Sequence, residues 1–159
     1  MYVAAVPCRY VRSFQYSDID IAFSLRQDDV NEIHAATGKY PYQQLRDTLI
    51  LDADRASRRT YTMLSPVTGK PFGLFGDTLE GLVWLVSTPE IERHSITFLR
   101  ESRKWINYFH NFHPILWNYV DARQTLHIKW LTKWLGFTIE GKTYKNDMLF
   151  HLVIHKKEE

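Results

Sequence analysis

The pattern of apolar and polar positions changes period several times along the chain, from helical spacing to strand-like alternation and back. Apolar residues recur every three or four positions in four stretches, and we expect helices over 19–36, 41–50, 94–112 and 125–135. Short alternating or continuous apolar runs predict strands over 10–14, 60–64, 72–76, 82–86, 115–120 and 148–155. This order is typical of an α/β domain rather than of a helical bundle or a β-sandwich.

Turn and capping residues place several of the expected boundaries. Asp28 is placed to cap a second helix within the first helical stretch, and Thr37-Gly38 would end it. Pro41 can open the next helix, because proline is tolerated in a first helical turn. The turn-rich segment 65–71 predicts a hairpin. The continuous apolar run 82–86 indicates a central strand that is buried on both faces.

Composition narrows the class of protein further. A chain of 159 residues with 45% hydrophobic and 24% charged residues is typical of one globular domain. The formal net charge of +2 is too balanced to predict a nucleic-acid partner. The single cysteine, Cys8, cannot form an internal disulfide, which favours a reducing compartment. No apolar run approaches the ~20 residues of a membrane helix, so we expect no membrane partner and a location in the cytosol.

Two resemblances rest on short blocks of residues. Trp134-Leu-Gly-Phe-Thr-Ile, preceded by a helix and a buried strand, resembles the C-terminal half of the GNAT family of N-acetyltransferases. The blocks Leu82-Val-Trp-Leu-Val-Ser-Thr, Leu116-Trp-Asn-Tyr-Val and His127-Ile-Lys-Trp-Leu resemble an internal virion protein family of short-tailed bacteriophages, which has a degenerate acetyltransferase-like sequence. This second resemblance covers residues 72–137.

The resemblance implies a fold class and a set of cofactor contacts. The fold would be α/β, a GNAT-like single domain over 1–159 with a central mixed β-sheet flanked by helices. Residues 1–70 would supply the N-terminal strand, helices and hairpin start, and 71–159 the half that binds acyl-CoA in the family. The family holds this cofactor with strand N–H groups and a helix N-terminus. The implied cofactor-binding residues are Leu85, Val86, Arg93, Ser95, Thr97 and Thr125.

The chain departs from the family's pattern in its phosphate loop. Arg93, Ser95 and Thr97 stand where the family has closely spaced glycines. We expect Glu90 and Glu92 in the first turn of the following helix, where carboxylates occupy its positive end and repel phosphate. The sequence therefore predicts no cofactor, with acetyl-CoA as the alternative.

No catalytic residue is assigned from the sequence. The family usually has a tyrosine where this chain has Thr132. Tyr119, Asp121 and His127 stay open as substitute acids or bases, and for His127 a local backbone hydrogen bond is the competing interpretation.

Two further groups of residues have the spacing of a possible metal site or partner-binding patch. His110 and His113 have a ligand-like spacing, but Pro114 ends the helix and no third ligand is near, so we expect no metal. Trp130 and Trp134 are four residues apart and share one helix face. They form either part of the core or an exposed patch that binds a partner.

The functional hypothesis follows from the virion resemblance. It predicts an internal, core or assembly protein of a phage virion, with a catalytically degenerate acetyltransferase scaffold. Its partners would be other virion proteins, bound through the Trp130 and Trp134 face, and an oligomer is left open. Its location would be the virion, with the host cytoplasm during assembly. The alternative is an active acetyl-CoA-dependent N-acetyltransferase that modifies a host or phage protein.

Overall fold

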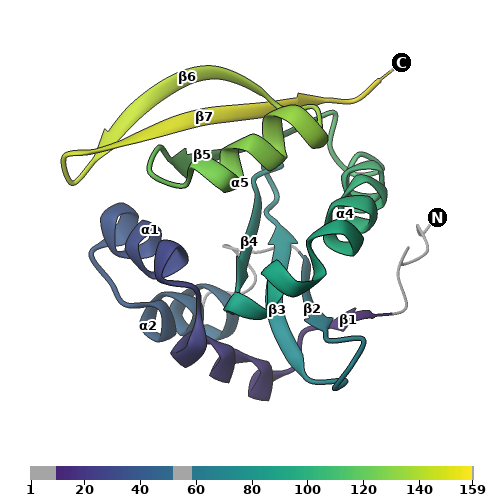
Figure 1. The fold of residues 1–159 in the computed structure, drawn as a ribbon. Helices are drawn as coiled ribbons and strands as arrows, with labels where there is room; N and C mark the ends of the chain where they lie inside the picture. Colours follow the sequence, from purple (N-terminus) through teal and green to yellow (C-terminus); the bar gives the residue numbers. More distant parts are fainter. Residues whose placement is uncertain (1–9, 52–58, 159) are drawn as a thin grey trace.

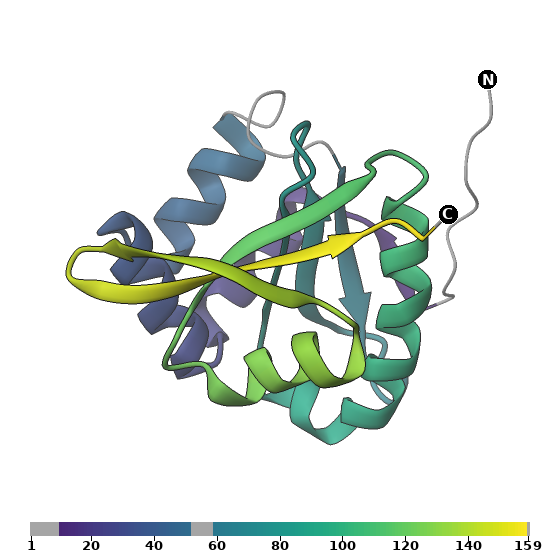
Figure 2. The same ribbon diagram turned by 90° about the horizontal axis from the view of Figure 1, so that it is seen from above.

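The computed structural model describes residues 10–51 and 59–158, so Cys8 lies outside the described residues. Four antiparallel strands form one sheet in the order β1-β2-β3-β4, with bounds β1 Val11–Ser13, β2 Arg59–Leu64, β3 Pro71–Asp77 and β4 Val83–Ser87. Three antiparallel strands form a second sheet in the order β5-β7-β6, with bounds β5 Ile115–Asp121, β6 Thr138–Lys145 and β7 Met148–Lys156. Figure 2 shows the β6–β7 hairpin lying across the rest of the molecule.

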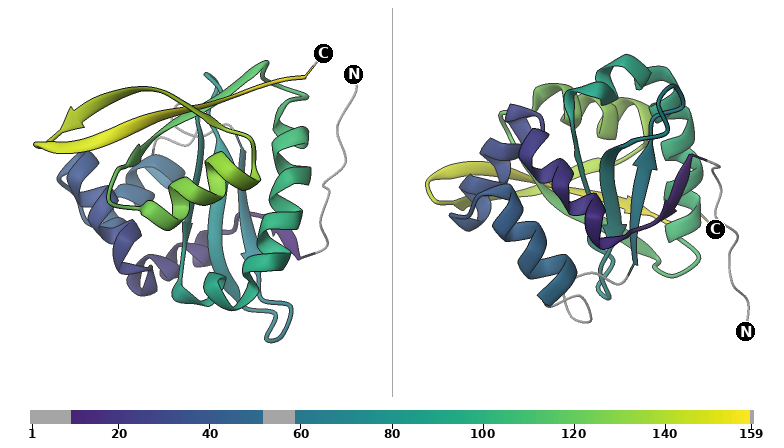
Figure 3. Two further views of the ribbon diagram at one scale, coloured as in Figure 1. Left: turned by 45° about the horizontal axis from the view of Figure 1, so that its top comes forward. Right: turned by 90° about the horizontal axis from the view of Figure 1, so that it is seen from below.

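Helices cover both faces of the first sheet. The α-helices are α1 Gln27–Thr37, α2 Pro41–Arg46, α4 Ser95–Phe109 and α5 Thr125–Lys129. Shorter 3₁₀ or π turns are η1 Tyr16–Ser24, η2 Asp47–Leu51, η3 Pro89–His94 and η4 Trp130–Trp134. Figures 1 and 3 show η1, α1 and α2 on one side of this sheet and α4 on the other. No helix within the described ranges is long and apolar enough to cross a membrane.

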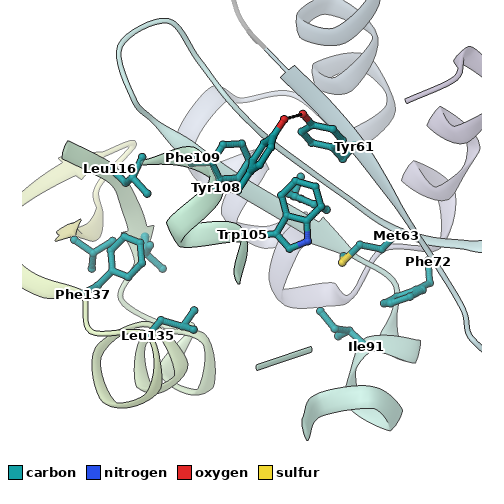
Figure 4. Close-up of a cluster of buried hydrophobic side chains, with 13 residues drawn as sticks. Tyr61, Met63, Phe72, Ile91, Trp105, Tyr108, Phe109, Leu116, Leu135 and Phe137 are labelled. Carbon is teal, nitrogen blue, oxygen red and sulfur yellow. Dashed lines mark hydrogen bonds between the residues drawn. The ribbon is translucent and has the colours of Figure 1, made fainter. Parts of the chain in front are cut away.

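The alternation of side chains along the strands creates two cores. Leu74 of β3 points to one face, where it joins Leu45 and Leu49 under the η1–α2 layer. Phe75, one residue further on, points to the other face and joins Trp105 and other residues of a largely aromatic cluster beneath α4 (Figure 4). The strand β3 therefore lies between the two cores and pairs with β2 on one edge and with β4 on the other.

The two sheets meet at a single point. Leu82 and Trp117 form an isolated parallel bridge where β4 and β5 begin, and the Trp117 amide donates to the Gly81 carbonyl at 3.1 Å. Beyond this bridge β4 and β5 belong to separate sheets. Together the seven strands make a mixed arrangement that is splayed between β4 and β5, which confirms the expected α/β fold class.

Several boundaries differ from those the sequence predicts. The first helical stretch is divided into η1 and α1, and Arg26 rather than Asp28 stands at the N-cap of α1, so the expected Asp28 cap is wrong. Gly38 ends α1 with φ of 73°, as expected, because a glycine adopts this left-handed conformation without strain. The second helix starts at Pro41 as predicted.

The strands show two more differences. In β4 only Ser87 is fully buried, so the strand is less buried than expected. Both of its faces are covered, since Val83 and Leu85 pack against the α4 core and Trp84 and Val86 against the α1–α2 core. The strand β6 was not predicted from periodicity, since most of its residues are exposed and few are apolar. It is joined to β7 by Asn146 and Asp147, both with positive φ.

Candidate active site

The backbone of β4 offers hydrogen-bonding groups to the splayed region. The Thr88 amide donates to the Phe72 carbonyl of β3 at 2.8 Å, so even-numbered residues of β4 pair with β3. The carbonyls of the odd-numbered residues from Gly81 to Ser87, and the amides of Val83, Leu85 and Ser87, therefore point away from β3 toward the side of β5.

Three of the four outward-facing carbonyls accept a hydrogen bond. Gly81 accepts from the Trp117 amide at 3.1 Å, and Val83 accepts from Asn118 Nδ2 at 2.8 Å. Ser87 accepts from the Arg26 amide at 2.9 Å. Leu85 lies between them, at the point where β4 and β5 have separated. Its backbone groups face a cavity rather than a strand.

The cavity has a volume of about 450 Å³, and its lining residues come from both faces of the splayed sheet. Its walls come from α1 and α2, from β4 and β5, and from α4, α5 and η4; they include Glu32, Ile33, Leu45, Leu85, Asn118, Val120, Thr97, Phe98, His127 and Trp130. Side chains from both faces therefore surround Leu85.

Two carboxylates of α1 hold the separated ends of β4 and β5. The Ser87 amide donates to Asp29 Oδ2 at 3.0 Å, and the Asp121 amide donates to Glu32 Oε2 at 2.9 Å. Gln124 Nε2 connects both carboxylates, at 2.7 Å from Glu32 Oε2 and 3.5 Å from Asp29 Oδ1. The strand ends are thus joined through side chains instead of backbone pairing.

Burial changes the acidity of both carboxylates. Burial raises the pKa of Asp29 to about 6, although the Ser87 amide and Arg26 lower it. Burial raises the pKa of Glu32 to about 7 against the hydrogen bonds from the Asp121 amide and Gln124. A carboxylate with this pKa gains and loses a proton near neutral pH, as a general base must.

Two more polar atoms at the start of α5 lack partners. Gln124 Oε1 and His127 Nδ1 are buried and have no hydrogen bond within the described residues. The two side chains are three residues apart and so share a face of α5. Burial, with the nearby Arg26, lowers the pKa of His127 to about 4, so its ring is neutral at pH 7. The expectation that a local backbone bond satisfies His127 does not hold for Nδ1.

Arg26 links this region to the segment after β4. Its guanidinium is buried and lies 3.3 Å from Asp28, 3.9 Å from Asp29 and 3.7 Å from Glu92. Since Glu92 belongs to η3, this ion-pair network joins the start of α1 to the segment that connects β4 with α4.

The structure places the implied cofactor-binding residues in different surroundings. Leu85, Val86 and Thr97 all line the cavity. Leu85 packs toward the α4 core and Val86 toward the α1–α2 core. Arg93 is exposed on η3, Ser95 is the first residue of α4, and Thr125 is exposed at the start of α5; none of the three is among the cavity-lining residues.

Glu90 and Glu92 lie in the first turn of the helical segment that follows β4, as expected, but this segment is η3 and not α4. Both residues lie in η3, and α4 starts only at Ser95 with no acidic residue in its first turn. Glu90 Oε1 lies 3.4 Å from His94 Nε2, while Glu92 faces Arg26. The positive end of α4 is therefore not occupied by these carboxylates.

Thr132, at the family's tyrosine position, and two of the residues left open as the acid or base have other partners. Thr132 Oγ1 donates to the Ile128 carbonyl of its own helical segment at 2.8 Å. Asp121 is buried, which raises its pKa, but hydrogen bonds from Arg123 outweigh this and leave the pKa below its usual range. The Tyr119 ring lies 5.1 Å from Lys145 Nζ and is not among the residues that line the cavity.

The two tryptophans of the expected patch separate. Trp130 is buried and packs against Phe98, with 5.4 Å between ring centroids, whereas Trp134 is 50% exposed. They form no joint exposed surface, because the η4 turn directs Trp130 toward α4. The virion partner expected at this face stays a prediction.

The histidines of the weighed metal site bind protein groups. His113 Nε2 lies 2.7 Å from Asp77 Oδ2, and His110 Nε2 lies 2.8 Å from His155 Nδ1. In residues 10–51 and 59–158 no three His, Cys, Asp or Glu side chains are grouped to hold a metal ion.

Sequence reasoning missed Asp29 and Glu32 as site residues. A signal was present: Asp29 and Glu32 are three residues apart on a helix that also carries Val30 and Ile33 toward the core. Their spacing places both carboxylates on one face of α1. What the spacing could not show is that this face meets the ends of β4 and β5.

Comparisons with solved structures identify the fold. The aminoglycoside acetyltransferase AAC(6')-Ib, solved with ribostamycin and coenzyme A, has a TM-score of 0.67 and 12% identity, covering 92% of each chain. Spermidine N-acetyltransferase from Vibrio cholerae, solved with CoA and spermine, has a TM-score of 0.64 and 14% identity, covering 92% of this chain and 94% of that one. Ribosomal-protein-S5-alanine acetyltransferase from Vibrio fischeri has a TM-score of 0.63 and 19% identity, covering 92% and 91%.

No protein-family model matches the chain, and no curated protein matches it in sequence. None of these comparisons supports the resemblance to the internal virion protein family. The expectation of no cofactor is contradicted, because structures with this fold were solved as coenzyme A complexes. The chain has the fold of the GNAT acetyltransferases.

Proposed function

We propose that this protein is an acetyl-CoA-dependent N-acetyltransferase whose acceptor is a small primary amine. The observation that carries the proposal is the splayed pair β4–β5, in which the backbone of Leu85 faces the cavity and Glu32 lines the same cavity. Acetyl-CoA supplies an activated thioester, which an amine converts into an amide while CoA leaves as a thiol.

The residues around the cavity fit this donor. The outward-facing backbone groups of Leu85 can bind an extended chain with amides, as a neighbouring strand would. On the α4 side, Thr97 lies in the first turn of a 15-residue helix, whose N-terminus attracts the negative charge of a diphosphate. The chain lacks the closely spaced glycines with which the family binds the diphosphate, and this reduces the fit. The carboxylates of Glu90 and Glu92 do not repel the diphosphate, because they face His94 and Arg26.

The acceptor would approach from the α1 side. A primary ammonium group has three N–H donors. On this side Glu32 and His127 line the cavity, and Gln124 and Asp29 lie directly behind Glu32. The two carboxylates favour a cation over a neutral ligand. Two of the similar structures were solved with spermine or an aminoglycoside, which are polyamines or amino sugars.

The chemical roles follow from position and acidity. Glu32 takes the proton from the ammonium group, because its pKa of about 7 lets it accept a proton near neutral pH. The Leu85 amide donates a hydrogen bond to the thioester oxygen as negative charge develops there. The low pKa of His127 keeps its ring neutral at pH 7. A neutral ring still carries one N–H, which can donate a hydrogen bond to the departing sulfur.

Release of CoA thiol from acetyl-CoA tests the proposal directly. The full chain is mixed with acetyl-CoA and one amine at a time: spermidine, an aminoglycoside, butylamine or a lysine-containing peptide. The proposal predicts amine-dependent thiol release with a matching acetylated product by mass spectrometry. Release at the same rate without any amine, or no release with every amine while acetyl-CoA binds, would overturn it.

A further inference from the structure

The part of the cavity that faces α1 and α2 has mainly apolar walls. Trp84 and Val86 of β4 point to this side, where they belong to one cluster with Ile33 of α1 and with Leu45 and Leu49 of α2 and η2. All five side chains line the cavity. Ile33, Trp84 and Val86 are only partly buried, so apolar surface stays open to a ligand. An apolar group would bind here favourably, because it removes this surface from water.

Carboxylates are scarce in the same walls. Among the described residues that line the cavity, Glu32 and Glu101 are the only acidic ones. Glu101 belongs to α4, on the other face of the sheet, and pairs with Lys104 at 3.2 Å. Asp29 lies behind Glu32 and accepts the Ser87 amide. The acceptor side can therefore pair one ammonium group, at Glu32, and the lining residues described there give a second ammonium group no carboxylate.

Two uncharged polar side chains line the same part of the cavity. Gln44 of α2 and Thr48 of η2 are both partly exposed. Thr48 Oγ1 donates to the Gln44 carbonyl at 2.8 Å, so this hydroxyl is satisfied within its own helical segment. An ammonium group at the far end of a ligand would meet an amide and a hydroxyl here, but no opposite charge. Partial loss of its water would then be costly.

The apolar wall continues along β4 from its open end. Val86 precedes Ser87, whose amide binds Asp29, and Glu32 lies one turn further along the same face of α1. Trp84 lies two residues nearer the closed end of β4, about 7 Å along the strand. Its ring edge lies over Gly76 of β3, where an added Cβ would come within 3.2 Å of Cζ2.

We propose that the acceptor is a primary monoamine with an apolar chain or ring, and not a polyamine or an amino sugar. This inference rests on the proposed function, because it needs an acceptor amine at Glu32. The ammonium group pairs with Glu32, and the apolar group lies between Ile33 and Trp84. In this respect the chain differs from the similar structures that were solved with spermine or an aminoglycoside.

Two amines of equal length test the inference on the full chain. Hexylamine and 1,5-diaminopentane differ only at the far end, where the first has a methyl group and the second an ammonium group. Thiol release from acetyl-CoA gives kcat/KM for each amine. We expect the value for hexylamine to be at least about tenfold higher, because the methyl group contacts apolar walls whereas the ammonium group loses water without gaining a counter-charge.

A variant with an added carboxylate sharpens this test. Thr48→Glu places a negative charge at the cavity wall, so it should raise kcat/KM for 1,5-diaminopentane by about tenfold and lower that for hexylamine. Thr37→Glu is the matched control at the exposed end of α1. Thr37 Oγ1 also donates to the carbonyl four residues earlier, of Ile33, but Thr37 does not line the cavity. Both kcat/KM values should stay near wild type in this control.

The outcomes separate this inference from the proposed function. A wild-type kcat/KM for 1,5-diaminopentane that equals or exceeds that for hexylamine overturns the inference and leaves the proposed function standing. An unchanged preference in folded Thr48→Glu also overturns it. The wild-type comparison decides alone if Thr48→Glu does not fold. Absence of amine-dependent thiol release with these two amines and with spermidine, an aminoglycoside and a lysine-containing peptide overturns both.

Discussion

The two ends of the β4–β5 pair are held together in different ways. At the closed end, the Trp117 amide donates to the Gly81 carbonyl, and the strands begin as neighbours. At the open end, the amides of Ser87 and Asp121 donate to carboxylates of α1. The first end is joined by backbone groups that do not titrate, and the second by side chains that do.

Because of this difference, we expect the closed end to contribute to stability and the open end to contribute to the reaction. Backbone pairing at the closed end has no charge to gain or lose near neutral pH. The carboxylates at the open end, with pKa values of about 6 and 7, satisfy buried amides, and Glu32 also lines the cavity of the proposed acceptor site. Changes at the open end should therefore affect chemistry, and changes at the closed end should affect stability.

Glu32→Gln is expected to have the largest effect. The amide keeps an oxygen for the Asp121 amide but cannot accept a proton, so kcat should fall by about 10²–10⁴-fold. Steady-state thiol release measures the loss, and calorimetric titration should show unchanged binding of acetyl-CoA. Glu140→Gln, on the exposed β6, is the control with no expected change.

An unchanged kcat in Glu32→Gln would remove Glu32 from the role of base. Loss of acetyl-CoA binding in the same variant would mean that Glu32 supports the cleft instead of the proton transfer.

At the closed end, Leu116→Ala should act on stability. Leu116 is fully buried at the start of β5, so its truncation should lower the free energy of unfolding by about 2–5 kcal/mol. Urea denaturation measures this change, and Ile115→Ala, at an exposed neighbour, is the control. The kcat of folded Leu116→Ala should stay close to that of wild type. A kcat loss as large as that of Glu32→Gln would abolish the distinction between the two ends.

The open end should also make stability depend on pH. Because burial raises the pKa of Glu32 in the folded protein, the folded state binds more protons than the unfolded state between about pH 4.5 and 7. Stability should therefore decrease as pH rises through this range, by on the order of 3 kcal/mol from this group. In Glu32→Gln the decrease should be smaller, as urea denaturation at several pH values would show. An identical slope in both proteins would contradict the assigned acidity.

Thr132→Ala should have the smallest effect. Its hydroxyl donates to the Ile128 carbonyl and not into the cavity, so kcat should change less than about twofold. A large loss of kcat measured by thiol release would contradict this and assign Thr132 a role in the reaction.

Local sequence signals were sufficient for much of the fold. The hairpin β2–β3, the start of α2 at Pro41 and the end of α1 at Gly38 depend on neighbouring residues, and each was predicted. The strand β6 was missed because its exposed residues give no apolar alternation. Leu85 and Val86 were placed in the site only through the resemblance to a family.

The open end could not be predicted from the sequence. Asp29 meets an amide 58 positions away, at Ser87, and Glu32 meets one 89 positions away, at Asp121. No local pattern specifies such pairs. The expectation of no cofactor failed for a related reason. Glu90 and Glu92 lie in the first turn of η3, but the sequence did not show that α4 begins separately at Ser95 or that Arg26 and His94 are the partners of these carboxylates.

Backbone NMR of the full chain during titration with acetyl-CoA tests the central claim most directly. The claim is that the outward-facing amide of Leu85 contacts the thioester in the cleft between β4 and β5. It predicts a large, saturable shift of the Leu85 amide signal, with slower hydrogen exchange, while the Val86 amide, which pairs with β3, changes far less. Saturable binding that leaves the Leu85 signal unmoved, or no binding at millimolar acetyl-CoA, would contradict it.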